Sequence, residues 1–199
     1  MLAPKSPTKI FLSNSRTVVA DMTKAWTCKT CGKLHEGIAD SYGYEAPWQW
    51  YTIPKAERTN RAFLNNDYCV IDDSDFFVRG CLEIPIVGGP EPFLWGVWVS
   101  LSKSNFEREQ RLVNDPKRTD EPPYFGWLCT RLEIYPDTAS LRTDVHTLTV
   151  GLRPLVKLQH TDHPLSLEQQ NGITVDRVIE IAEKMEHGWK HPEWNAKAL

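Results

Sequence analysis

Two apolar runs joined by a glycine- and proline-rich turn constrain the fold of this chain most. Over 76–86 most even positions are apolar, while the odd positions include Arg79 and Glu83. A period of two is typical of a strand with one buried face. The turn sequence Gly88-Gly-Pro-Glu-Pro92 follows, and a second apolar run occupies 93–101. The sequence therefore predicts a β-hairpin in the middle of the chain.

Other strand signals follow this hairpin, and helix signals lie towards the ends of the chain. Alternation predicts three more strands, over 124–134, 140–150 and 153–159. Helices are predicted over 54–62, from a cap at Ser102 or Ser104 to before Pro116, and from Thr174 onward. Without a βαβ rhythm, this order predicts an α+β fold: a central antiparallel β-sheet with helices on one side.

The length and composition fit an ordinary globular protein. The chain has 199 residues, of which 41% are hydrophobic and 25% charged. Its first twenty residues contain no acid, and several are Ser or Thr. We predict a disordered leader over 1–24 and a single α+β domain over 25–199, which includes a cysteine knuckle at 26–36.

Charge and cysteine content limit the partners and the compartment. The net charge of −3 provides no basic field for a phosphate backbone, so nucleic-acid binding is not expected. No stretch approaches the ~20 apolar residues that span a bilayer, so no membrane association is expected. An odd number of cysteines, five, argues against a secreted disulfide framework and favours a cytoplasmic protein.

Cys28 and Cys31 form a C-x-x-C pair that is followed directly by Gly32. This spacing lets two thiolates reach one tetrahedral ion, and the glycine permits a tight turn whose N–H groups can point at sulfur. His35 follows closely and can add an imidazole nitrogen. The sequence predicts a zinc site with Cys28, Cys31 and His35 as ligands.

The fourth ligand stays open, because a second C-x-x-C pair is absent. Candidates from elsewhere in the chain are His160, His163, Cys69, Cys81 and Cys129. Two other interpretations compete with zinc. A thioredoxin-like redox pair would need a helix that starts within the motif, whereas Gly32 follows it here. The remaining alternative is a pair of solvent-facing thiols without a metal.

Charged residues that alternate along the predicted strands suggest a second site. If the faces of these strands coincide, guanidinium groups and aromatic rings meet and can bind an anionic or planar ligand. The predicted ligand-binding residues are Arg79, Arg131, Arg142, His146 and Trp98. The alternative is a solvated sheet face with weak cross-strand ion pairs.

No catalytic residues are predicted. The chain lacks a P-loop, a dinucleotide-binding fingerprint, H-E-x-x-H and G-x-S-x-G. Asp144 and His146 are neighbours on one strand face, but no serine or cysteine nucleophile is identifiable beside them.

Several unusual strings, in the same order, resemble the bacterial family called domain of unknown function 2199. They are Cys28–His35, Phe76–Pro85, Trp95–Ser102, Glu121–Trp127, Tyr135–Thr138 and Thr161–Leu165. The resemblance covers roughly 25–187 and leaves the leader outside. The family has no established activity, so the resemblance implies a small intracellular bacterial protein. It also favours one unit over a detachable zinc finger.

Three functions follow from these features. The leading hypothesis is a non-enzymatic zinc-binding module that recognises a protein or a small anionic ligand. The second is a metal-dependent hydrolase, which needs an open position on the ion and an acid such as Glu36 or Asp162. The third is an immunity or regulatory protein that masks a partner. Four protein ligands would indicate a structural ion, and three with a water a catalytic one.

Overall fold

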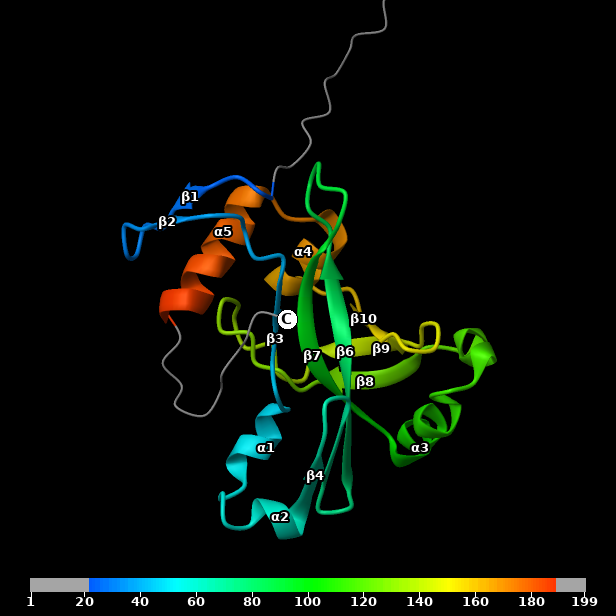
Figure 1. Ribbon diagram of the computed structural model, residues 1–199. Helices are drawn as coiled ribbons and strands as arrows, with labels where there is room; N and C mark the ends of the chain where they lie inside the picture. Colours follow the sequence, from blue (N-terminus) through cyan, green and yellow to red (C-terminus); the bar gives the residue numbers. More distant parts are fainter. Residues whose placement is uncertain (1–21, 189–199) are drawn as a thin grey trace, which may run out of the picture.

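The computed structural model describes residues 22–188, so the predicted leader over 1–24 lies almost entirely outside the described residues. The strands are β1 (Trp26–Thr27), β2 (Leu34–His35), β3 (Ser41–Gly43), β4 (Ala62–Leu64), β5 (Tyr68–Ile71), β6 (Asp75–Ile84), β7 (Phe93–Leu101), β8 (Tyr124–Leu128), β9 (Arg142–His146) and β10 (Leu155–Leu158). The helices are α1 (Trp48–Thr52), α2 (Arg58–Arg61), α3 (Lys103–Leu112), α4 (Pro164–Asn171) and α5 (Val175–Glu183), with a 3-10 turn η1 (Pro116–Asp120) and a π-helical turn η2 (Lys184–Gly188). The mixed α+β class is confirmed (Figure 1).

Five strands, β6 to β10, close into a barrel. Each pairs with its neighbour along the chain in antiparallel fashion, and β10 then pairs with β6 in parallel, with Leu155 opposite Cys81. An odd number of up-and-down strands brings the first and the last together in the same direction, so the closing pair must be parallel. Outside the barrel, β3 runs parallel to β7, and β5 and β4 extend from β6.

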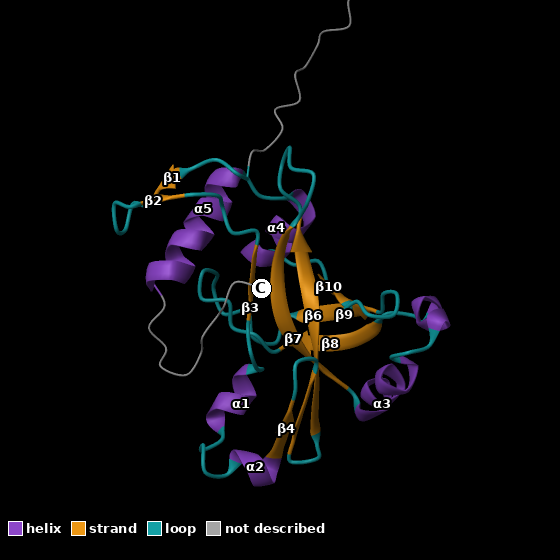
Figure 2. Cartoon of the chain, viewed as in Figure 1, coloured by secondary structure: helices purple, strands orange, loops and turns teal. Residues whose placement is uncertain are grey.

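The predicted open antiparallel sheet with helices on one side therefore needs correction. Most strand pairs are antiparallel, but the sheet is closed and contains two parallel pairings. The helices lie around the barrel: α3 at one side, α1 and α2 near one end, and α4 and α5 near the other (Figure 2). Closure joins strands that are distant in the sequence, and a local alternation pattern carries no information about it.

The predicted β-hairpin is confirmed as β6 and β7, whose register runs from Phe76 opposite Leu101 to Ile84 opposite Phe93. Alternate residues of the barrel strands fill its interior, as is usual for a small barrel. The largest fully buried side chains are Trp95, Trp98, Phe77 and Phe93. The Trp98 indole N–H donates to the Tyr44 carbonyl oxygen at 2.9 Å, so this ring belongs to the core.

Capping residues and prolines in the sequence predicted some of the helices but not all of them. Ser102 caps α3 by accepting from the Asn105 N–H at 3.3 Å, and Thr174 caps α5, as predicted. The predicted helix over 54–62 shrinks to α2, and α1 ends before Pro54. Helix α4, which is not predicted from the sequence, has His163 as its N-cap residue.

The predicted strand over 124–134 ends at Leu128. Beyond it, the Thr138 hydroxyl accepts from the Leu132 N–H at 2.9 Å and donates to the Thr130 carbonyl at 2.8 Å. These hydrogen bonds fold the segment into a compact loop. Leu128 and Leu132 are both buried, which explains why the sequence resembles a longer strand.

Barrel closure leaves no room for a side chain at position 80. A β-carbon on Gly80 would lie 2.6 Å from Val156 Cγ2 and 2.8 Å from the Pro154 carbonyl oxygen. We therefore expect Gly80→Ala to lower the free energy of unfolding by ~1–3 kcal/mol, as overpacking does. Thermal unfolding measures this, with Glu107→Ala on the exposed face of α3 as the control. An unchanged Tm for Gly80→Ala would contradict the tight closure.

Candidate metal centre

The predicted cysteine pair lies in the turn between β1 and β2, where Trp26 pairs with His35. Gly32 adopts a positive φ of 69°, which glycine accepts without strain. The Gly32 N–H donates to the Cys28 carbonyl at 2.9 Å, and the Cys28 N–H donates to the Lys33 carbonyl at 2.9 Å. These bonds define a tight turn that carries both cysteines.

The turn places two sulfur atoms and one imidazole nitrogen together. The Cys31 N–H points at Cys28 Sγ from 3.4 Å, as expected from the sequence. Cys31 Sγ lies 3.8 Å from His35 Nε2. The His35 ring stacks on Trp26 with centroids 4.6 Å apart, and the Trp26 N–H in turn donates to the Gly37 carbonyl. The imidazole orientation is therefore fixed by packing.

His187 completes the group. One ligand atom from each of Cys28, Cys31, His35 and His187 lies within 4.8 Å of the other three. His187 stands on η2, which continues α5, and α5 lies beside the β1–β2 hairpin (Figure 1). A hydrogen bond of 2.5 Å from the Lys29 N–H to Glu183 Oε1 also joins the hairpin to α5.

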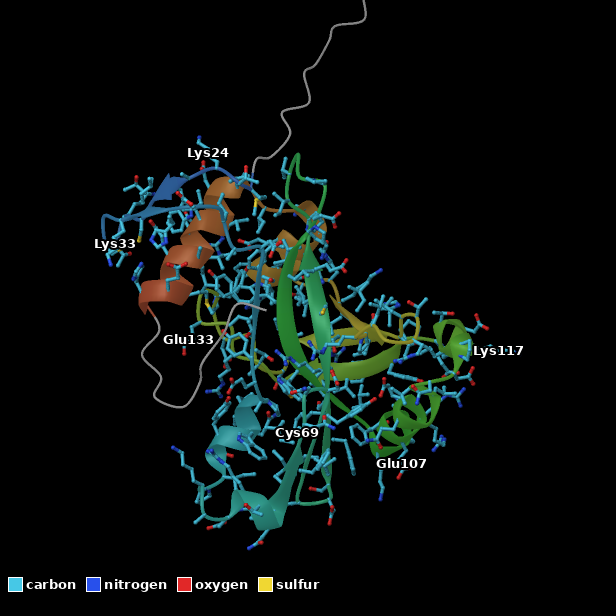
Figure 3. The ribbon with its side chains drawn as sticks, in the orientation of Figure 1. Lys24, Lys33, Cys69, Glu107, Lys117 and Glu133 are labelled. Atoms are coloured by element: carbon cyan, nitrogen blue, oxygen red, sulfur yellow. The ribbon has the colours of Figure 1, made fainter. Side chains whose placement is uncertain are left out.

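The other candidates for the fourth ligand lie elsewhere and are not members of the group. His160 Nδ1 lies 3.0 Å from Gln170 Oε1, and His163 Nδ1 accepts from the Leu165 N–H. Cys69 lies far from the hairpin residues Lys24 and Lys33 in Figure 3. The fold does not bring these candidates into the group at the hairpin; it brings the end of α5 there instead.

The local sequence around His187 does not identify it as a ligand. The predicted amphipathic helix buries Val178, Ile181 and Ala182. Glu183 and His187, four residues apart, lie one turn from each other on such a helix. A lone histidine near a helix C-terminus ordinarily indicates an interaction with the helix dipole, so nothing local marks it as a ligand.

The donor set fits a zinc ion. Zn–S and Zn–N bonds of ~2.0–2.3 Å give tetrahedron edges of roughly 3.3–3.8 Å. The 3.8 Å separation of Cys31 Sγ and His35 Nε2 meets this value, and the widest separation, 4.8 Å, needs only a small inward movement. In addition, His187 Nε2 is buried and has no hydrogen-bond partner among the described residues, with Glu186 Oε2 at 3.9 Å. Metal coordination would satisfy this nitrogen, which otherwise costs free energy.

Glu186 supports the same geometry from outside the group. Its Oε2 lies 3.4 Å from His35 Nδ1, so Nε2 is the nitrogen that faces the sulfur atoms. A carboxylate that accepts from the second ring nitrogen fixes the orientation of a metal-binding histidine and makes it a better ligand. The arrangement resembles the carboxylate–histidine–metal chains of zinc sites.

The five residues predicted for ligand binding do not converge on one pocket. Trp98 is in the core. The guanidinium of Arg131 lies 4.6 Å from the Trp48 ring centroid, and that of Arg142 lies 5.6 Å from the Trp127 centroid. His146 lies on β9, where burial, with Lys157 as a second cause, lowers its pKa. Of the five, only Arg79 lines the cleft beside α3.

Comparison with known proteins identifies a family but no function. A family model described as an uncharacterized protein conserved in bacteria, domain of unknown function 2199, matches residues 27–173 and confirms the resemblance seen in the sequence. The match includes Cys28, Cys31 and His35 and ends before α5. No curated protein and no solved structure matches the chain. Within residues 22–188, no helix has the length and apolar character needed to cross a membrane.

Proposed function

We propose that this chain, which belongs to the bacterial family of uncharacterised proteins called domain of unknown function 2199, binds one structural zinc ion and acts as a non-enzymatic binding protein. The zinc ligands are Cys28, Cys31, His35 and His187. In this arrangement the β1–β2 turn is a zinc knuckle, and the ion ties it to the end of α5. The partner, a protein or a small anionic ligand, stays a prediction.

One observation carries the proposal: donors from both ends of the described chain lie within 4.8 Å of one another. Two thiolates and two imidazoles in a tetrahedral arrangement favour zinc. Calcium and magnesium prefer oxygen ligands, and none of the four donors is an oxygen.

The complete set of ligands supports a structural ion over a hydrolytic one. A catalytic zinc keeps one position open for the water that it activates. Here four protein side chains can fill all the positions of a tetrahedron. Glu36 and Asp162, the acids that a hydrolase would use, are not members of the group.

An ion at this position would add to the stability of the hairpin. Strands β1 and β2 have two residues each, and an isolated two-stranded hairpin is marginal in water. When an ion bridges the hairpin and α5, the free energy of zinc binding contributes to folding. At free zinc of ~1,000 times Kd this contribution is ~4 kcal/mol.

Zinc removal is expected to destabilise the protein. Purified protein should contain one zinc per chain by X-ray fluorescence, and a chelator should lower Tm by roughly 10 °C, given ~2–4 °C per kcal/mol for a chain of this size. Cys28→Ser should abolish both the bound metal and the chelator effect, whereas Cys81→Ser on β6 should retain both. Wild-type protein without zinc and with a chelator-independent Tm would refute the proposal.

His187→Ala tests the ligand that the sequence did not reveal. We expect the Kd for zinc to rise roughly 100-fold or more, since loss of an outer hydrogen-bond partner alone costs ~10–100-fold. Competition with a chromophoric chelator measures this Kd. His160→Ala is the matched control, because His160 is an exposed histidine outside the group. Equal Kd values for the two variants would exclude His187 as a ligand.

Glu186→Gln should weaken zinc binding by ~10–100-fold without abolishing it. The amide keeps the size of the side chain but removes the charge that favours the His35 Nδ1–H. Glu180→Gln on α5, the helix that η2 continues, is the control, because Glu180 pairs with Arg177. If both variants bind zinc like the wild type, Glu186 does not support the ligand.

A further inference from the structure

A cleft of about 150 Å³ lies beside α3. Helix α3 is on the other side of the barrel from the β1–β2 hairpin (Figure 1). Strand β6, the segment before β5, α3, η1 and the segment 151–154 all contribute to its walls. Its charged lining residues are Asp67, Arg79, Glu109, Arg118 and Arg153. Their charges sum to +1, because three arginines face two carboxylates.

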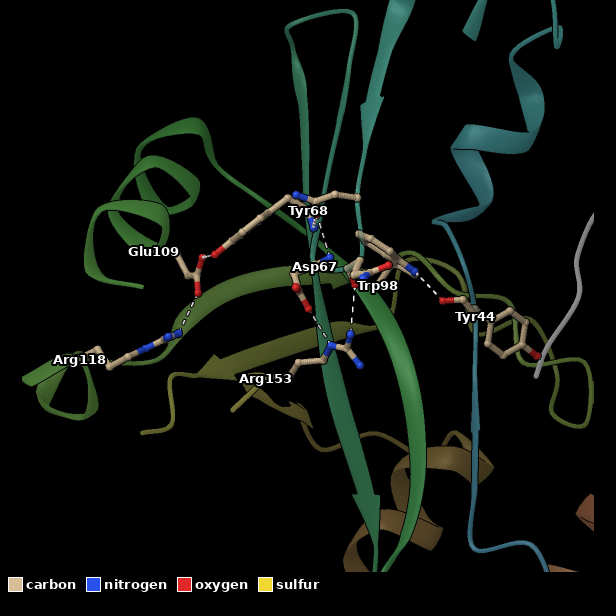
Figure 4. Close-up of polar contacts among 9 residues, drawn as sticks. Tyr44, Asp67, Tyr68, Trp98, Glu109, Arg118 and Arg153 are labelled. Atoms are coloured by element: carbon tan, nitrogen blue, oxygen red, sulfur yellow. Dashed lines mark hydrogen bonds and ion pairs between the residues drawn. The ribbon is translucent and has the colours of Figure 1, made fainter. Parts of the chain in front are cut away.

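The deepest ion pair of the cleft joins Arg118 to Glu109, although Arg118 Nε has no hydrogen-bond partner among the described residues. Arg118 Nη2 donates to Glu109 Oε1 at 2.8 Å, and each side chain is only 3% exposed. The Tyr68 hydroxyl donates to the other Glu109 oxygen at 2.5 Å, and Arg118 Nη1 donates to the Val113 carbonyl at 3.0 Å (Figure 4). Both carboxylate oxygens of Glu109 are therefore occupied.

The second ion pair, nearer the solvent, uses the other carboxylate. Arg153 Nε donates to Asp67 Oδ1 at 2.8 Å, and Arg153 Nη2 donates to the Asn66 carbonyl at 3.4 Å. The Arg153 side chain is one-third exposed. Its guanidinium is thus anchored at the mouth of the cleft.

Arg79 is the arginine of the cleft that lacks an acceptor. Its side chain donates no hydrogen bond to any residue in the described part of the chain, and its Nε is buried. Burial, followed by repulsion from Arg153, lowers its pKa. A buried N–H group without an acceptor is unfavourable. Arg79 has no such partner, although the neighbouring Arg118 and Arg153 each pair with a carboxylate.

We propose that this cleft binds a small oxyanion, a phosphate or carboxylate group, through the guanidinium of Arg79. Oxygen atoms of such a group accept from a guanidinium in a bidentate manner and would cancel the excess positive charge. At ~10–15 Å³ per water, the volume corresponds to roughly ten water positions. That space suits a small anion or the anionic end of a metabolite. The proposal does not depend on the metal centre.

Calorimetric titration of the chain as purified tests the site, with inorganic phosphate in one arm and acetate in the other. We expect one-site binding with a Kd of ~1 mM or tighter for at least one anion. Arg79→Gln should raise this Kd at least tenfold, because hydrogen bonds to charged groups contribute ~1.5–3 kcal/mol. Arg142→Gln, an equal change of charge on β9, should bind like the wild type.

The outcomes of the titration are decisive in both directions. Binding of phosphate alone or acetate alone identifies the class of oxyanion. Failure of both anions to saturate the protein, or an unchanged Kd in Arg79→Gln, would overturn the proposal.

Thermal unfolding of Arg79→Met separates a binding role from a structural one. In a buffer without phosphate or carboxylate, we expect Tm to be equal to or above that of the wild type, because a buried Nε–H group without an acceptor has been removed. Added anion should raise the Tm of the wild type but not of the variant. A large loss of Tm in the anion-free buffer would assign Arg79 a structural role and overturn the proposal.

Discussion

The parallel contact between β10 and β6 determines the positions of both candidate sites. The Cys81 N–H donates to the Pro154 carbonyl at 2.9 Å, and β10 can approach this closely because residue 80 is a glycine. The segment 151–154 that leads into β10 carries Arg153 to the cleft that Arg79 lines from β6. Without the contact, Arg79 would face solvent as the sequence alternation suggests.

The chain after β10 returns to the segment just beyond the end of β6, and this contact fixes the position where α5 begins. Ile173 forms a parallel bridge with Ile86, in which the Val87 N–H donates to the Ile173 carbonyl and the Ile173 N–H donates to the Pro85 carbonyl. Gly172 makes the turn with a φ of 81°, and a β-carbon there would lie 2.8 Å from the Pro85 carbonyl oxygen. Helix α5 starts from this fixed point, which is why His187 meets a hairpin formed at the start of the described chain.

Features predicted correctly from the sequence depend on neighbouring residues. The hairpin alternation and the Ser102 and Thr174 caps each need contacts within a few residues. The closed barrel and the His187 ligand instead depend on contacts between distant segments. The arginines of the cleft also combine local and long-range information. The outward direction of Arg79 follows from its strand alone. Its neighbours Arg118 and Arg153 come from η1 and the loop before β10, which are distant in the sequence.

The two candidate sites differ in which of their polar groups have a partner. This difference supports a structural role for the hairpin site and a ligand-binding role for the cleft. At the hairpin, Glu186 and Trp26 already orient His35, so one ion can satisfy the remaining donor atoms and close the site. A site closed by its own side chains has no position left for a substrate. In the cleft, Glu109 pairs with Arg118 and Asp67 pairs with Arg153, whereas Arg79 has no ion pair among the described residues. The buried Nε atoms of Arg79 and Arg118 both lack a hydrogen-bond partner there. A buried donor without an acceptor is unfavourable in the folded chain. A ligand that accepts from Arg79 would remove this unfavourable term and therefore gain binding free energy.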